Sequence, residues 1–367
     1  MYDIDTFMYI IIHINMLLYI KLKQRLIVKI NNYKKKIRYS ILDLLPILEG
    51  SNSANAISNA VKLAQFADNS KFTRFWIAEH HNMGGIASSA TSVLIGHIAN
   101  ATKNIRVGAG GIMLPNHAPL MVAENFGTLE TIYPNRIDLG LGRAPGTDGF
   151  TARALRRKQT QSNEDSFPSD ISELLGYLDS SSNQTVKAIP GEGTNVPIWI
   201  LGSSLYGAKL AAKLGLPFSF ASYFAPNHLV EAINIYRESF IPSKYLDKPY
   251  VMMSMSVFGA DTDSEALYLR TSYQQAYANL ITGRAGPLPL PVKDINTVIP
   301  QEILRSVNQS MLINATGGPE KMQKELSSII DSYQPDEIIF YSPIHSLDKR
   351  IKSFSIAGEI VDNMNIT

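Results

Sequence analysis

The chain contains no cysteine among its 367 residues. This absence excludes disulfide bonds, thiolate nucleophiles and cysteine-ligated metal sites, and it fits a cytoplasmic protein. A strong charge of either sign is also missing, because 34 basic residues stand against 32 acidic ones. After residue 40 the basic residues form no long cluster, so we expect no nucleic-acid partner. A hydrophobic content of 45% with 18% charged residues is typical of a well-packed globular protein.

The N-terminal region lacks an uninterrupted hydrophobic run long enough to cross a membrane. Residues 7–22 are apolar, but His13 and Asn15 interrupt them, and the run is shorter than the roughly 20 residues that a span needs. Acidic residues precede the run where a signal peptide would be basic. Basic residues follow it, which leaves a cytoplasmic-facing membrane anchor as the less favoured alternative. We interpret residues 1–38 as an extension outside the fold, consistent with translation from an upstream start.

What the sequence does contain is a regular alternation of strand-like and helix-like segments. Residues 75–78, 105–115 and 136–142 are short apolar runs typical of strands, and residues 88–101 and 120–132 between them have helical character. This alternation predicts a parallel sheet. Polar clusters follow each apolar run, and an α/β barrel keeps its chemistry at the carboxyl ends of its strands. The pattern therefore indicates an enzyme.

The alternation continues along the rest of the chain. Further strands are expected at residues 38–45, 197–201, 218–222, 250–259 and 337–341. Eight strands alternating with helices favour a TIM (β/α)8 barrel over residues 39–360 rather than a doubly wound sheet. Residues 283–300 are rich in Gly and Pro and predict an insertion before the last βα unit, residues 150–168 predict a long loop, and residues 361–367 predict a tail.

Glu79, His80 and His81 form the strongest polar cluster at a strand end. A zinc-protease helix needs two His one turn apart with Glu between them, so we expect no metal here. Adjacent residues of an extended segment point in opposite directions. One histidine should therefore face the barrel mouth as an acid/base group, while the other packs behind it. A purely structural histidine pair is the alternative.

Gly110 and Gly111 belong to a glycine-rich stretch, residues 108–111, inside the third predicted strand. Glycine weakens a strand interior and often marks the close approach of a ligand or of another backbone. A bulge of small residues in a crowded barrel core is the alternative. A bulky side chain at Gly111 is expected to occupy the ligand's place.

Arg143 and the segment Gly202-Ser203-Ser204 follow the fourth and fifth predicted strands. A permanent cation at a strand end suits a phosphate, although a salt-bridged surface arginine would look the same. Free amides at a helix start favour a phosphate too, although serine is also a common helix cap. Together with the glycines and a histidine, these residues describe a pocket for a phosphorylated planar cofactor, and FMN fits that description.

The same residues carry a resemblance to a known family. The chain resembles the luciferase-like flavin-dependent monooxygenases from about Tyr39 to Gly358, and it looks closest to the single-chain bacterial branch of unknown substrate. The match is densest in AEHHNMGGIASSA, VGAGGIMLPNHAPL, ENFGTLETIYPNRIDLGLGRAPGTD and PIWILGSSLYGAKLAAKLGLPFSFAS. Two positions depart from the pattern: Ser203 stands where luciferase has an acidic residue, and Tyr223 stands where this branch has His.

The resemblance implies a function. Reduced FMN would be the cosubstrate and molecular oxygen the oxidant of a small organic substrate, through a peroxide at the flavin C4a carbon. A separate NAD(P)H:flavin reductase would supply the reduced flavin, and the chain would form a homodimer. A deazaflavin- or flavin-dependent hydride-transfer reductase and a non-catalytic flavin-binding protein are the alternatives.

The resemblance also implies roles for individual residues. His80 matches the catalytic histidine and Glu79 its flavin-side neighbour. Gly110-Gly111 match a non-prolyl cis peptide that lies against the flavin ring. Arg143 and Ser204 match contacts to the flavin phosphate.

Overall fold

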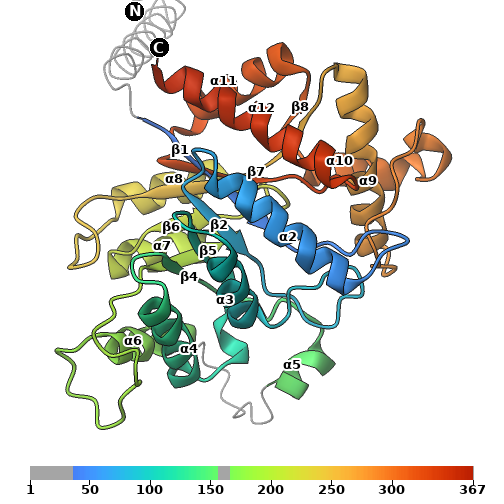
Figure 1. Cartoon of the computed structure of the whole chain (residues 1–367). Helices are drawn as coiled ribbons and strands as arrows, with labels where there is room; N and C mark the ends of the chain where they lie inside the picture. Colours follow the sequence, from blue (N-terminus) through green and yellow to red (C-terminus); the bar gives the residue numbers. More distant parts are fainter. Residues whose placement is uncertain (1–35, 156–165, 367) are drawn as a thin grey trace, which may run out of the picture. The chain divides into compact units, whose positions relative to one another are not determined.

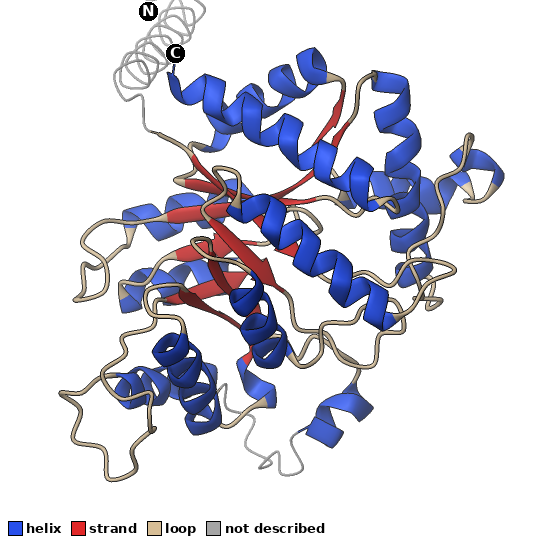
Figure 2. Cartoon of the chain, viewed as in Figure 1, coloured by secondary structure: helices blue, strands red, loops and turns tan. Residues whose placement is uncertain are grey.

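Eight parallel strands close into a barrel in the computed structural model, which describes residues 36–155 and 166–366. The strands follow one another around the ring in chain order, and the ring closes through the pairs β6–β7, β7–β9 and β9–β1. Helices surround the strands (Figures 1 and 2). The barrel strands are β1 (Arg38–Asp43), β2 (Arg74–Ile77), β3 (Arg106–Met113), β4 (Ile137–Gly142), β5 (Ile198–Gly202), β6 (Phe218–Phe220), β7 (Val251–Gly259) and β9 (Glu337–Tyr341). The predicted TIM barrel is confirmed.

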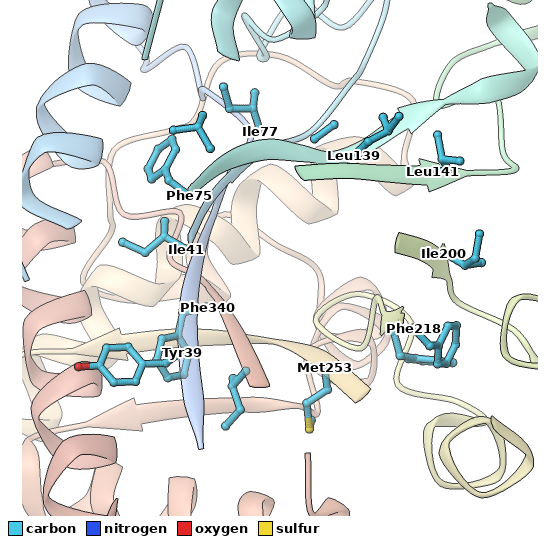
Figure 3. Close-up of a cluster of buried hydrophobic side chains, with 14 of the residues drawn as sticks. Tyr39, Ile41, Phe75, Ile77, Leu139, Leu141, Ile200, Phe218, Met253 and Phe340 are labelled. Carbon is cyan, nitrogen blue, oxygen red and sulfur yellow. The ribbon is translucent and has the colours of Figure 1, made fainter. Parts of the chain in front are cut away.

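Two apolar layers hold the barrel together, because side chains alternate between the two faces of each strand. Ile41 and Phe75 point toward the helices and pack in one large buried cluster, part of which Figure 3 shows. Their chain neighbours Leu42 and Trp76 belong to a second buried cluster. Strands that are apolar on both faces are typical of a sheet whose faces are both covered.

The helices of the described residues include the two that the sequence predicts at residues 88–101 and 120–132. The helices are α2 (Ser53–Asp68), α3 (Thr91–Ala101), α4 (Pro119–Ile132), α5 (Gly149–Leu155), α6 (Phe167–Leu178), α7 (Leu205–Leu214), α8 (Leu229–Glu238), α9 (Asp263–Ile281), α10 (Gln301–Ser310), α11 (Pro319–Tyr333) and α12 (Leu347–Ile366), with short 3-10 turns at Leu114–Asn116 and Ile295–Thr297. Asn52 caps α2 by accepting a hydrogen bond from the Asn55 amide. Gly215 ends α7 in the left-handed conformation (φ 62°), where a side chain would be strained. No helix of the described residues is both long and apolar enough to cross a membrane.

The insertion before the last βα unit contains more structure than residues 283–300 suggest. It includes α10 and a ninth strand, β8 (Asn314–Gly317), which the sequence pattern does not predict. β7 is nine residues long, so its first half pairs within the barrel and its second half, from Ser256 to Gly259, pairs with β8. β8 therefore lies outside the closed ring. Its sequence, NATG, is too short and too polar to show the alternation of a strand.

Three predicted boundaries need correction. The expected loop at residues 150–168 includes most of α5 and the start of α6, and its residues 156–165 lie outside the described part of the chain. The expected tail continues α12 as far as Ile366, and Val361 is fully buried. The expected extension, 1–38, is described only from residue 36. Arg38 already belongs to β1, and the backbone of Ile37 exchanges two hydrogen bonds with the Asn365 side chain.

Charged side chains close the amino-terminal end of the barrel. The Arg74 guanidinium donates to the carboxylates of Asp138 and Glu337 at 2.8–3.0 Å, and all three side chains are buried. Arg106 donates to the other oxygen of Asp138 at 2.7 and 2.9 Å. Each of these residues stands at or near the first position of its strand. The opposite end, where the strands end, is left for the site.

Candidate functional site

A cavity of about 240 Å³ lies at the carboxyl ends of the strands, and we call it the mouth pocket. It brings together every residue that the sequence singled out for the site except Glu79. The predicted residues in its wall are His80, Gly110, Gly111, Arg143, Gly202, Ser203 and Ser204. These residues lie up to 124 positions apart in the sequence, from His80 to Ser204. The barrel places them together because its parallel strands all end at the same rim.

His80 lies just after β2 and faces the mouth pocket. Its Nδ1 is 3.2 Å from the carbonyl oxygen of Gly146. A carbonyl can only accept, so Nδ1 carries the proton and Nε2 keeps a lone pair. Burial lowers the pKa of His80 below its usual value of 6.5, and the Gly146 carbonyl and the Glu79 charge only partly oppose that shift. The imidazole is therefore neutral at neutral pH and can accept a proton.

Glu79 does not line the mouth pocket but lies behind its wall, with only 1% of its surface exposed. Its Oε1 accepts hydrogen bonds from Nε2 of His81 and of His117, both at 2.8 Å, and its Oε2 accepts one from the Met113 amide at 3.1 Å. Burial by itself would raise the pKa of Glu79, but these hydrogen bonds outweigh it and lower the pKa. Glu79 therefore holds the end of β3 and the segment after β2, and it does not line the cavity.

The histidine pair separates as the alternation predicts. His80 faces the cavity, whereas His81 turns back to Glu79. No pattern in the sequence points to His117, which stands 38 positions after Glu79 and meets it only in the folded chain.

Glu79, His81 and His117 also form a group of metal-ligand type. Each offers one ligand atom, and the three atoms lie within 4.8 Å of one another. Because both imidazoles reach the same carboxylate oxygen at hydrogen-bond distance, two N–H donors already account for the arrangement.

Gly110 and Gly111 are joined by a cis peptide bond, which confirms the expectation from the family resemblance. The register with β4 shifts between Ala109 and Ile112, as a bulge or similar irregularity would produce, so the alternative interpretation of this stretch describes its backbone as well. A Cβ on Gly111 would come within 2.7 Å of the Gly140 carbonyl oxygen. A side chain at Gly111 would therefore strike the β4 backbone first, which corrects the expectation that it would enter the ligand's place. Both glycines nevertheless line the cavity and leave that part of its wall flat.

The start of α7 forms a second wall of the mouth pocket. Ser204 occupies the N-cap position with an extended backbone, yet its side chain makes no capping hydrogen bond. The alternative that Ser204 is only a helix cap is therefore not supported, and the hydroxyl and the first-turn amides can serve a ligand. The Arg143 guanidinium lies 4.1 Å from the centre of the Tyr206 ring, in the first turn of the same helix. This stacking brings a cation to the amide-rich end of α7, and no pattern in the sequence points to Tyr206.

Hydrogen bonds from neighbouring loops hold the segment after β4 that carries Arg143. Thr147 Oγ1 donates to the carbonyl of His81 at 2.9 Å, and Asn116 Nδ2 donates to the carbonyl of Pro145 at 2.8 Å. The hydrogen bond from His80 to the Gly146 carbonyl is a third contact that holds this segment. The segments after β2, β3 and β4 therefore form one connected rim, which limits the positions open to Arg143.

A second cavity, of about 260 Å³, adjoins the mouth pocket and shares His80, Tyr223 and Phe224 with it. We call it the tyrosine cavity, because Tyr223, Tyr273, Tyr277 and Tyr341 line it. Tyr223, which departs from the family pattern, lies at the junction of the two cavities.

Comparison with known proteins agrees with this geometry. The model of a family described as luciferase-like monooxygenase matches residues 37–288. A luciferase-like monooxygenase of Escherichia coli (strain K12) is 45% identical over 331 residues, covering 90% of this chain and 98% of that protein. The N-acetyl-S-alkylcysteine monooxygenase of Bacillus subtilis (strain 168) is 31% identical over 336 residues, covering 89% and 98%. The crystal structure of apo-MsnO8 matches with a TM-score of 0.78 at 29% identity, covering 89% of this chain and 98% of that one.

Proposed function

Because this chain belongs to the luciferase-like monooxygenase family, we propose that it is an FMN-dependent monooxygenase. It would use reduced FMN and molecular oxygen to oxidise a small organic substrate. One observation carries the proposal above the others. A single cavity combines an uncapped helix start, an arginine, a flat glycine wall and a neutral histidine.

The residues of the mouth pocket fit the parts of FMN. Ser203, Ser204 and the first amides of α7 would bind the phosphate, with Arg143 as the cation beside them. The isoalloxazine would lie against Gly110 and Gly111, where a wall without side chains accepts a flat ring. Bound reduced FMN would supply the activation of oxygen. A separate NAD(P)H:flavin reductase would deliver it.

His80 would act as the acid/base group of the site. Its Nδ1 proton is committed to Gly146, so Nε2 is the atom that can take up a proton in the cavity and return it. His80 lines both cavities, and a substrate in the tyrosine cavity would therefore meet the same imidazole as the cofactor. Glu79 would be a positioning residue, because it holds His81, His117 and the end of β3.

We extend the proposal to the location, the oligomeric state and the folded range of the chain. The chain would work in the cytoplasm as a homodimer. The folded part would begin just before β1, and the residues that precede it would be dispensable for FMN binding.

Anaerobic titration with reduced FMN, followed by exposure to oxygen, tests this function. We expect saturable binding of reduced FMN and oxygen-dependent reoxidation kinetics that change when His80→Asn replaces the wild type. Saturable binding of a deazaflavin in preference to FMN, with turnover that does not depend on oxygen, would instead identify a hydride-transfer reductase. FMN binding with kinetics identical in the wild type and His80→Asn would identify a non-catalytic flavin-binding protein.

A further inference from the structure

The walls of the tyrosine cavity come from six parts of the chain, two of which are the segment after β6, with Tyr223, and β9, with Tyr341. Leu44 follows β1, Ile86 follows β2, Ala276 stands on α9, and Leu288 belongs to the inserted segment after α9. The cavity measures about 260 Å³. An apolar cavity of about 150 Å³ accommodates benzene, so by proportion this one accommodates about ten non-hydrogen atoms.

The cavity wall carries no formal charge. Among the described residues that line it there is no Asp, Glu, Lys or Arg. His80 is the one imidazole in this wall, and its burial keeps it neutral at neutral pH. An ionised group that left water for this cavity would lose its hydration without gaining a partner of opposite charge. The wall therefore selects against carboxylate and ammonium ligands.

The tyrosine hydroxyls give the cavity its polar character. Within the part of the chain that the structure describes, no hydrogen bond reaches the hydroxyl of Tyr223, Tyr273, Tyr277 or Tyr341. Their rings pack against one another, with centroids 4.8 Å apart for Tyr223 and Tyr341 and 5.5 Å apart for Tyr273 and Tyr341. Burial raises the pKa of the Tyr223, Tyr273 and Tyr341 phenols well above 10, so each of these three stays protonated and can donate. A hydroxyl that loses water on ligand binding needs an acceptor in return.

We propose that the tyrosine cavity is the substrate site, and that it takes an uncharged, mainly apolar molecule of about ten non-hydrogen atoms with a carbonyl acceptor. The donors in the wall would hold the carbonyl, and the neutral wall would exclude the corresponding carboxylate. The assignment as substrate site rests on the proposed function. His80, Tyr223 and Phe224 line both this cavity and the mouth pocket, where FMN is proposed to bind.

A pair of isosteric probes tests the proposal directly. 4-Phenylbutan-2-one and 3-phenylpropanoate have the same skeleton and the same number of non-hydrogen atoms, and they differ in a methyl group against a charged oxygen. Calorimetric titration of the full-length protein, with and without saturating FMN, should show the ketone binding at least about tenfold more tightly. Equal affinity, or tighter binding of the carboxylate, would overturn the proposal.

Variants on α9 sharpen the result. Ala276→Arg places a cation in the wall and should shift the preference toward the carboxylate by about tenfold or more, whereas Ala276→Met adds bulk without charge and should weaken both probes alike. Tyr273→Phe should weaken ketone binding about two- to tenfold. The matched control is Tyr268→Phe, on the same helix but 40% exposed and outside the cavity, which should bind the ketone like the wild type. An unchanged preference in Ala276→Arg would place the probes elsewhere and refute the site.

The two proposals fail in different ways. If FMN binds but the probes do not discriminate, the substrate class is wrong and the proposed function stands. If the ketone preference and its response to Ala276→Arg are observed but FMN does not bind, the cavity chemistry is upheld and the FMN-dependent function is refuted.

Discussion

Replacing Arg143 is the most direct way to test the cofactor site. Arg143→Ala removes the cation that lies 4.1 Å from the Tyr206 ring beside the start of α7. Losing one charge-assisted contact to a phosphate should cost about 1.5–3 kcal/mol, which is roughly a 10- to 150-fold rise in the dissociation constant of FMN. Arg143 is exposed, so salt screens the contact, and the lower end of this range is expected at high ionic strength.

Related variants separate charge from geometry. Arg143→Lys keeps the charge but loses the planar group that stacks on Tyr206, so we expect an intermediate loss. Ser204→Ala removes one uncommitted hydroxyl and should cost about 0.5–1.5 kcal/mol. The matched control is Arg153→Ala, which removes an exposed cation from α5, outside the mouth pocket.

The assay is an anaerobic equilibrium titration of each variant with reduced FMN, repeated at two salt concentrations. Thermal unfolding of each variant without FMN checks that the barrel is intact. The reasoning would be refuted if Arg143→Ala bound FMN like the wild type. It would also be refuted if Arg153→Ala lost as much affinity, because a general loss of positive charge would then explain the effect.

Three further predictions concern stability. Because the pKa of His80 is lowered in the folded state, its contribution to the free energy of unfolding is present above the usual value of 6.5 and is lost as pH falls through the folded-state value. In urea unfolding from about pH 8 to about pH 5, the free energy of unfolding should therefore decline less in His80→Asn than in the wild type. Gly111→Ala should lower the free energy of unfolding by about 1–3 kcal/mol because its Cβ would meet the β4 backbone, whereas Gly149→Ala, whose Cβ meets nothing within 4 Å, should not. A chain that starts at Lys36 should melt like the full-length protein, whereas one that starts at Tyr39 loses the first residue of β1 and should melt at a lower temperature; equal melting temperatures for the two truncations would contradict this.

The local pattern of the sequence is sufficient for most of the barrel. The strands are apolar on both faces and the helices amphipathic, so each element shows its type within a window of about ten residues. The same local reasoning separates His80 from His81, because alternation along an extended segment depends only on neighbouring positions. It fails for β8, whose four residues are held in place by β7 and not by their own composition.

The tertiary structure decides the features that depend on residues far apart in the chain. From its place beside His80 in the sequence, Glu79 is expected in the cavity, but His117 and the Met113 amide hold it behind the wall. The same holds for the tyrosine cavity, whose residues from Leu44 to Tyr341 meet only when the barrel closes. The sequence by itself indicates where the barrel strands lie and which side chains follow them. Which of them meet, and whether a hydroxyl finds a partner, depends on packing between distant segments, for which no short stretch of sequence holds the information.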